Sequence, residues 1–176
     1  MSEQKNSRQD WLSFFMDLSF FWAERSTCVR RKVGAIAVKN KRVIASGYNG
    51  VISGHEHCTP ETCFRTVNNI PSGQQLDMCY ALHAEQNLIL QAAGMGGLLT
   101  DCDVYCTTMP CHTCLKLLLN LGIKSIYFAG NYDLASIKST LEREAIVKNR
   151  TACQIFKVEK DSNSNGYSMW IPVLLE

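Results

Sequence analysis

Two different periods of hydrophobic and polar residues divide the first 46 positions of this chain. Apolar residues between positions 10 and 26 recur at helical spacing, which predicts an amphipathic helix with Asp10 near its N-cap. The segments 33–38 and 42–46 are rich in β-forming residues, and the turn-forming residues 39–41 lie between them. The pattern therefore predicts one helix followed by an antiparallel hairpin.

Helices and strands alternate in the second half of the chain. Helices are predicted over 81–93, 111–121 and 134–147, and strands over 103–108, 125–129 and 152–158. Strands that alternate with helices lie parallel, with right-handed crossovers. The sequence thus predicts an α/β fold, a three-layer α/β/α sandwich with a mixed five-stranded sheet. We expect a single domain over 1–176, with its core at about 10–158 and a tail at 159–176 that is in part apolar enough to pack or pair.

The segment 51–78 has no clear period, and a loop of this length in a compact domain needs a function or a metal staple. Four cysteines lie on it or near it, and His55 and His57 add nitrogen donors. The cysteines are Cys28, Cys58, Cys63 and Cys79. A second, structural zinc is one interpretation, because closing a long loop with a metal removes chain entropy. Buried or free thiols are the other.

Composition narrows the class of protein. A net charge of +2 is too balanced for a protein that coats nucleic acid, but it is compatible with a small anionic substrate. The N-terminus has no secretory pattern and no apolar run reaches membrane-spanning length, so we expect a cytoplasmic protein without a membrane partner. In that compartment, nine cysteines favour metal binding or buried thiols over disulfides.

Two short motifs carry the chemistry. They are His83-Ala84-Glu85 and the Pro-Cys-x-x-Cys segment at 110–114, which contains Cys111 and Cys114. Thiolates three residues apart at a helix start face one point, and the helix dipole favours their charged form. With His83 from another helix start they make three zinc ligands, which leaves a fourth position for water. Glu85 is then placed to move a proton from that water to a substrate and on to the leaving group.

Each motif alone has other interpretations. A lone Cys-x-x-Cys is often half of a structural zinc site or a redox pair. The redox interpretation needs a thioredoxin-like context that is absent from the sequence. The joint occurrence of both motifs is the signature of zinc-dependent deaminases of nucleobases.

The motifs resemble those of the cytidine and deoxycytidylate deaminase superfamily, from Arg25 to about Gly130, and most of all those of its deoxycytidylate (dCMP) deaminase branch. Five segments carry the resemblance: 25–35, 47–50, 83–87, 105–111 and 121–124. The resemblance implies a cytidine deaminase-like fold and zinc-dependent hydrolysis of dCMP to dUMP and ammonia, with Glu85 as the proton shuttle. It also implies that some relatives hold a structural zinc at the positions of Cys28 and Cys58.

The resemblance further implies Asn49 and Pro110 as substrate-binding residues, a homo-oligomer such as a hexamer, and dCTP and dTTP as effectors. For the 5′-phosphate, Arg25, Arg30 and Arg31 are candidates, because guanidinium matches phosphate bidentately. The alternatives are a deaminase of cytidine, guanine or tRNA adenosine, and a non-catalytic binding module of the competence type. The presence of Glu85 favours an enzyme over the binding module.

Overall fold

The computed structural model describes residues 8–130, 153–162 and 166–172. The predicted helix at 134–147 lies outside the described residues. None of the helices in the described ranges is long and apolar enough to cross a membrane. The prediction of one domain over 1–176 stays a prediction.

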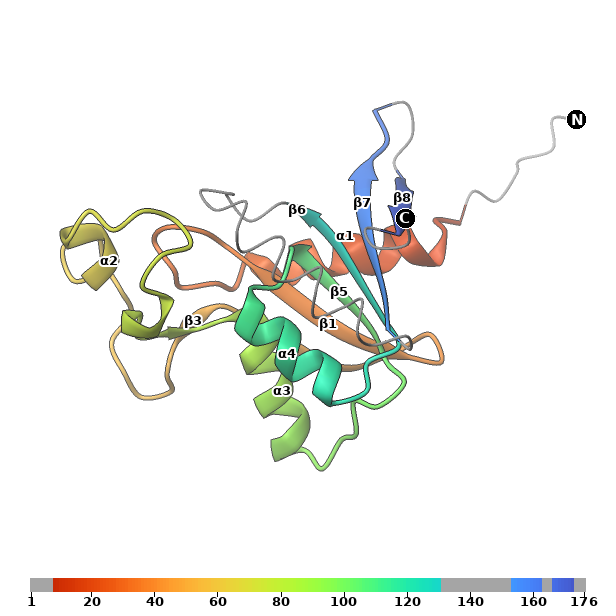
Figure 1. Ribbon diagram of the computed structural model, residues 1–176, viewed down its shortest axis with the longest axis horizontal. Coiled ribbons are helices and arrows are strands. Elements are labelled where there is room, and N and C mark those ends of the chain that lie inside the picture. Colours follow the sequence, from red (N-terminus) through yellow and green to blue (C-terminus); the bar gives the residue numbers. More distant parts are fainter. Residues whose placement is uncertain (1–7, 131–152, 163–165, 173–176) are drawn as a thin grey trace, which may run out of the picture.

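A mixed sheet of six strands forms the centre, in the order β2-β1-β5-β6-β7-β8 (Figure 1). The strands are β1 (Gly34–Lys39), β2 (Arg42–Tyr48), β5 (Asp103–Thr108), β6 (Ser125–Gly130), β7 (Gln154–Lys160) and β8 (Tyr167–Pro172). The strands β5, β6 and β7 are parallel to one another, and the neighbours β2, β1 and β8 join antiparallel. The mixed sheet is confirmed, but the predicted count of five was wrong, because the apolar segment of the tail pairs with β7 as β8.

Three helices cover the two faces of the sheet (Figure 1). They are α1 (Trp11–Ala23), α3 (Ala84–Gly94) and α4 (His112–Asn120). On one face, Phe15 and Met16 of α1 are buried against Ile36, Tyr105 and Val158. The opposite face carries α3 and α4, so the three-layer α/β/α arrangement is confirmed.

The core under α3 and α4 consists of aliphatic side chains from both helices and the sheet. Leu88 of α3 and Leu118 of α4 have no exposed surface, and neither do Val104 and Ile126 of the strands below. Each methylene buried in this way contributes about 0.8 kcal/mol. This packing fixes where the first turn of each helix lies.

Local signals fix the ends of several elements. Asp10 is the N-cap of α1, and its carboxylate accepts a hydrogen bond from the Ser13 N–H at 3.0 Å. Asn40 and Lys41 have positive φ, as a tight hairpin turn between β1 and β2 requires. Gly122 follows α4 with φ of 73°, a conformation that glycine adopts without strain.

The irregular segment 51–78 is more structured than predicted. It holds the short helix α2 (Phe64–Val67) and a single 3-10 turn, η1 (Leu76–Met78). A two-stranded sheet of β3 (Gly50–Val51) and β4 (Ala81–Leu82) joins the two ends of the segment. The predicted helix at 81–93 therefore begins only at residue 84, because residues 81 and 82 pair with β3.

Candidate active site

The two motifs meet at the first turns of α3 and α4. His83 is the N-cap residue of α3, and Cys111 is the N-cap residue of α4, both with extended backbone. Cys114 lies in the first turn of α4, three residues after Cys111, on the same side of the helix. Both helix starts belong to elements that the buried core holds against the sheet, so the three side chains converge.

The three donor atoms have the geometry of a zinc site. The Nδ1 atom of His83 lies 3.4 Å from the Sγ of Cys111 and 3.4 Å from the Sγ of Cys114. Ideal tetrahedral zinc with its usual bond lengths separates a nitrogen and a sulfur ligand by about 3.6 Å. All three donors lie within 4.8 Å of one another, and within the described ranges no other set of three histidine, cysteine or acidic donors does so. Zinc therefore fits here with three protein ligands, the number that a catalytic site uses.

Hydrogen bonding among the three ligands shifts their protonation. Donation from Cys114, supported by His83, lowers the pKa of the Cys111 thiol to about 4 in spite of burial. The same contact raises the pKa of Cys114, and burial acts in the same direction. The hydrogen bond with Cys111 raises the pKa of His83. A cation bound here would favour the thiolate form of both cysteines.

Glu85 lies beside the three ligands in the first turn of α3. Its side chain is buried, with 4% of its surface exposed. Burial raises the pKa of its carboxyl to about 7, although His83 acts against this shift. A carboxyl with a pKa near neutrality both accepts and donates a proton at physiological pH, as a general acid and base must.

Polar residues of α3 hold the helix against β2. The Gln86 side chain accepts a hydrogen bond from the backbone N–H of His83 at 2.8 Å. Asn87 donates to the carbonyl of Tyr48 at 2.7 Å, and Gln91 accepts from the backbone N–H of Ser46 at 2.6 Å. These contacts lock the backbone that carries His83 and Glu85.

Gly47 lets the backbones of β2 and α3 come into direct contact. A Cβ atom at position 47 would lie 2.2 Å from the carbonyl oxygen of Ala84 and 2.5 Å from the amide nitrogen of Leu88. Both distances are far below van der Waals contact. The glycine therefore sets the depth at which α3 sits on the sheet.

A pocket of about 260 Å³ opens beside His83 and Glu85. Its wall includes Asn49, Arg30 and Arg31. It therefore places one predicted metal ligand, His83, and the predicted proton shuttle, Glu85, on the same wall as polar and cationic side chains. A small anionic molecule suits such a pocket.

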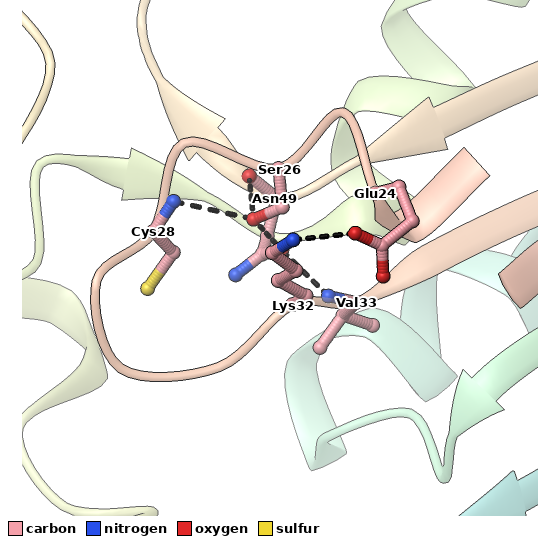
Figure 2. Close-up of polar contacts among 6 residues, drawn as sticks. All are labelled: Glu24, Ser26, Cys28, Lys32, Val33 and Asn49. Atoms are coloured by element: carbon pink, nitrogen blue, oxygen red, sulfur yellow. Dashed lines mark hydrogen bonds and ion pairs between the residues drawn. The ribbon is translucent and has the colours of Figure 1, made fainter. Parts of the chain in front are cut away.

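Asn49 organises the loop that carries the two arginines (Figure 2). Its Oδ1 accepts hydrogen bonds from the Ser26 hydroxyl at 2.6 Å and from the Val33 N–H at 2.8 Å. Its Nδ2 donates to the carbonyl of Arg31 at 2.8 Å. Ser26 in turn accepts from the N–H of Cys28 at 3.2 Å. The side-chain amide thus crosslinks residues 26–33, a contact that the sequence does not reveal.

Two of the predicted substrate-binding residues do not line this pocket. Arg25 is exposed at the end of α1, and its backbone N–H donates to the carbonyl of Trp22. Pro110 is fully buried, and the pocket wall contains its neighbour Met109 but not Pro110 itself. Their roles stay predictions.

Arg65 of α2 lines the pocket and was not anticipated. It lies in the segment 51–78, where no hydrophobic period indicated which side chains turn inward. The signal that could have found it is its place between Cys63 and Pro71. Cysteine is often buried and proline often lies in a turn, so the chain between them is a candidate for packing against the domain.

The four cysteines of the predicted second metal site gather around Cys58. Burial raises the pKa of that thiol, and the neighbouring Cys63, Cys79 and Cys28 raise it further. All four are free thiols, and Cys28 and Cys79 also line the pocket. Within the described chain, however, no three of these sulfurs lie within 4.8 Å of one another.

Comparisons with known proteins agree with the site. A family model for the cytidine and deoxycytidylate deaminase zinc-binding region matches residues 9–130. The chain is 38% identical over 143 residues to a deoxycytidylate deaminase of Schizosaccharomyces pombe, across 81% of this chain and 44% of that protein. It is 35% identical over 127 residues to the deoxycytidylate deaminase of Mycobacterium phage D29, across 69% of this chain and 96% of that protein.

The fold is also similar to solved structures. The crystal structure of dCMP deaminase from the cyanophage S-TIM5 in complex with dCMP and dUMP matches with a TM-score of 0.62 and 27% identity, over 82% of this chain and 93% of that one. The chain spans about half the length of several relatives that it matches, 44% of the Schizosaccharomyces pombe protein and 40% of the Saccharomyces cerevisiae deoxycytidylate deaminase.

Proposed function

Because this chain belongs to the cytidine and deoxycytidylate deaminase family, we propose that it hydrolyses dCMP to dUMP and ammonia in a zinc-dependent reaction. The observation that carries the proposal is the convergence of His83, Cys111 and Cys114, of which His83 lines an arginine-lined pocket together with the buried Glu85. The dCMP and dUMP bound in the cyanophage enzyme support this choice of substrate.

His83, Cys111 and Cys114 would hold the zinc. When bound, zinc lowers the pKa of water and so supplies a nucleophile at neutral pH. Glu85 accepts the proton that the water loses and delivers it to the ring nitrogen beside the amino-bearing carbon. After the water oxygen has bonded to that carbon, Glu85 takes the remaining proton from the new hydroxyl group and passes it to the amino group. The C–N bond then breaks, the hydroxyl oxygen becomes a carbonyl oxygen, and the amino group leaves as ammonia. The buried position of Glu85 keeps both transfers away from bulk solvent.

A substrate panel tests the proposed function. The zinc-loaded protein is given dCMP, dCTP, deoxycytidine, cytidine, guanine and a tRNA anticodon stem-loop, and ammonia release is followed. We expect the highest kcat/KM with dCMP. A higher kcat/KM with guanine or with the tRNA stem-loop would refute dCMP as the substrate and support one of the alternative deaminases.

Glu85→Gln tests the role of the glutamate. The substitution keeps the size of the side chain but removes the exchangeable proton, so we expect kcat to fall at least about 100-fold. The zinc content and the melting temperature should stay those of the native protein. Undiminished turnover in this variant would exclude the proposed shuttle.

We also propose a structural zinc held by Cys28, Cys58, Cys63 and Cys79. Their places on and beside the irregular segment 51–78 support it, because a metal that closes a long loop removes chain entropy. Two zinc ions per chain by elemental analysis, falling to one in Cys58→Ser, are the expected result. One zinc per chain in the native protein would refute this second site.

Assembly, effectors and location belong to the same proposal. Four aromatic residues of α1 are exposed, Trp11, Phe14, Phe20 and Phe21, which supports burial of this helix in a homo-oligomer such as a hexamer. Light scattering after size exclusion gives the subunit number, and a monomer would refute the assembly. Titration with dCTP and dTTP tests regulation. A cytoplasmic location is consistent with nine free thiols.

A further inference from the structure

Arg65 places a buried positive charge on the wall of the pocket that holds His83 and Glu85. Only 9% of the residue surface is exposed. Its Nη2 donates a hydrogen bond to the carbonyl of Pro71 at 2.8 Å. Its Nε is buried and donates to no acceptor in the described parts of the chain. The guanidinium is thus held in place but keeps unused donor capacity.

No carboxylate compensates this charge among the described residues. The ion pairs found there join Lys32 to Glu24 and Lys157 to Glu159, and neither involves Arg65. Removing a cation from water without an anionic partner is costly. A bound anion that reaches Arg65 through the pocket would offset this cost.

The local fold holds Arg65 toward the pocket. The backbone N–H of the buried Ile70 donates to the carbonyl of Arg65 at 2.9 Å, and this closes the chain behind the side chain. Ser72, next to Pro71, lines the same pocket. The guanidinium is therefore preorganised, which lowers the entropy lost when it binds a ligand.

The position and chemistry of Arg65 identify the ligand group. Arg65 and His83 line the same pocket, so a molecule bound beside His83 also lies beside the guanidinium. Arg30 and Arg31 line the same pocket. A planar guanidinium matches the oxygens of a phosphate with two parallel hydrogen bonds.

Resting on the proposed function, we propose that Arg65 binds the 5′-phosphate of the nucleotide and makes the enzyme prefer a nucleotide over a nucleoside. Arg65 is thereby a specificity-determining residue supplied by the irregular segment rather than by the sheet. A purely structural role, in which the guanidinium only holds the carbonyl of Pro71, makes a different prediction. It would affect phosphorylated and unphosphorylated substrates equally.

Steady-state kinetics with dCMP and deoxycytidine separate the two roles. We expect Arg65→Gln to raise the KM for dCMP roughly 10- to 100-fold, since a hydrogen bond to a charged group contributes about 1.5–3 kcal/mol. The kcat/KM for deoxycytidine should stay within about twofold of the native value. This substrate has no 5′-phosphate, so it makes no contact with the guanidinium that the substitution could remove. Arg65→Lys should recover part of the loss. Arg42→Gln, a change of an exposed arginine on β2, is the matched control and should leave both substrates unaffected.

Equal loss for both substrates in Arg65→Gln, or an unchanged KM for dCMP, would overturn the proposal. Should Arg65→Gln not fold, Arg65→Lys carries the test, with a rise in KM confined to dCMP. Calorimetric measurement of phosphate binding distinguishes failure of the Arg65 proposal from failure of the proposed function. If the native protein deaminates no cytosine compound, binding of inorganic phosphate is measured instead. Binding that Arg65→Gln abolishes supports the phosphate contact, and equal or absent binding in both proteins refutes it.

Discussion

Gly47→Ala is expected to lower activity by displacing the start of α3, which carries His83 and Glu85, although position 47 itself is not on the pocket wall. The added Cβ would lie 2.2 Å from the carbonyl oxygen of Ala84, whereas ordinary contacts of this kind begin at 3.4 Å. The start of α3 must therefore move away from β2 by about 1 Å. The hydrogen bonds of Asn87 and Gln91 flank position 47 and lengthen as the helix moves.

The magnitude follows from two contributions. Overpacking of a tight contact costs about 1–3 kcal/mol, and each weakened hydrogen bond costs up to about 1 kcal/mol. We therefore expect the free energy of unfolding to fall by about 2–4 kcal/mol. Because α3 carries His83 and Glu85 in its first turn, a displacement of about 1 Å should also lower kcat roughly 100-fold.

Urea unfolding followed by circular dichroism measures the stability, and ammonia release from dCMP measures the activity. Gly94→Ala is the matched control, because a Cβ at the last residue of α3 meets no atom within 4 Å. That variant should keep full activity and change the stability by no more than about 1 kcal/mol, in the stabilising direction. Native stability and activity in Gly47→Ala would refute the argument that the glycine sets the position of the helix.

Two further predictions concern the metal and a helix cap. Cys114→Ser should lower the zinc content by one per chain, measured by elemental analysis, and abolish turnover. Cys102→Ser changes a buried thiol outside the site and should keep both the zinc and the turnover. An unchanged zinc content in Cys114→Ser would contradict the ligand assignment. Asp10→Ala should cost about 1 kcal/mol in urea unfolding and Asp10→Asn less, because both aspartate and asparagine accept the hydrogen bond that caps α1. The hydrogen bond from Ser13 lowers the pKa of the Asp10 carboxyl, so the stability that its charge contributes is present above about pH 4 and is lost as the pH falls further. Unlike Gly47→Ala, neither Asp10→Ala nor Asp10→Asn is expected to lower the activity.

The sequence predicts the starts of α1 and α4 to within about one residue, because local signals determine them. The start of α3 was predicted at residue 81 rather than 84, because the pairing of residues 81 and 82 with β3 has no local signal. The joint occurrence of the two motifs predicts that His83, Cys111 and Cys114 converge, and the structure brings their donor atoms together because both helices pack on the same face of the sheet. The role of Glu85 stays a prediction.

The pocket wall was not accessible in the same way. Arg65 faces the pocket because of contacts made by Pro71 and Ile70, in a segment without a hydrophobic period. Likewise Asn49 lies in a short Gly-Tyr-Asn-Gly stretch, and only the fold shows that its amide holds residues 26–33. Interactions between residues far apart in a chain leave little trace in the local composition, and substrate contacts depend on such interactions.

The short pairing of β3 with β4 has a consequence for how this protein can be altered. It brings Gly50 opposite Leu82 and Val51 opposite Ala81, so the chain between them leaves and rejoins the body at neighbouring points. A replacement of residues 52–80 that retains this pairing would leave His83, the residue directly after β4, at its place. Such an exchange would replace Arg65 and Ser72 on the pocket wall, while the backbone that carries His83 and Glu85 keeps its anchor in β4.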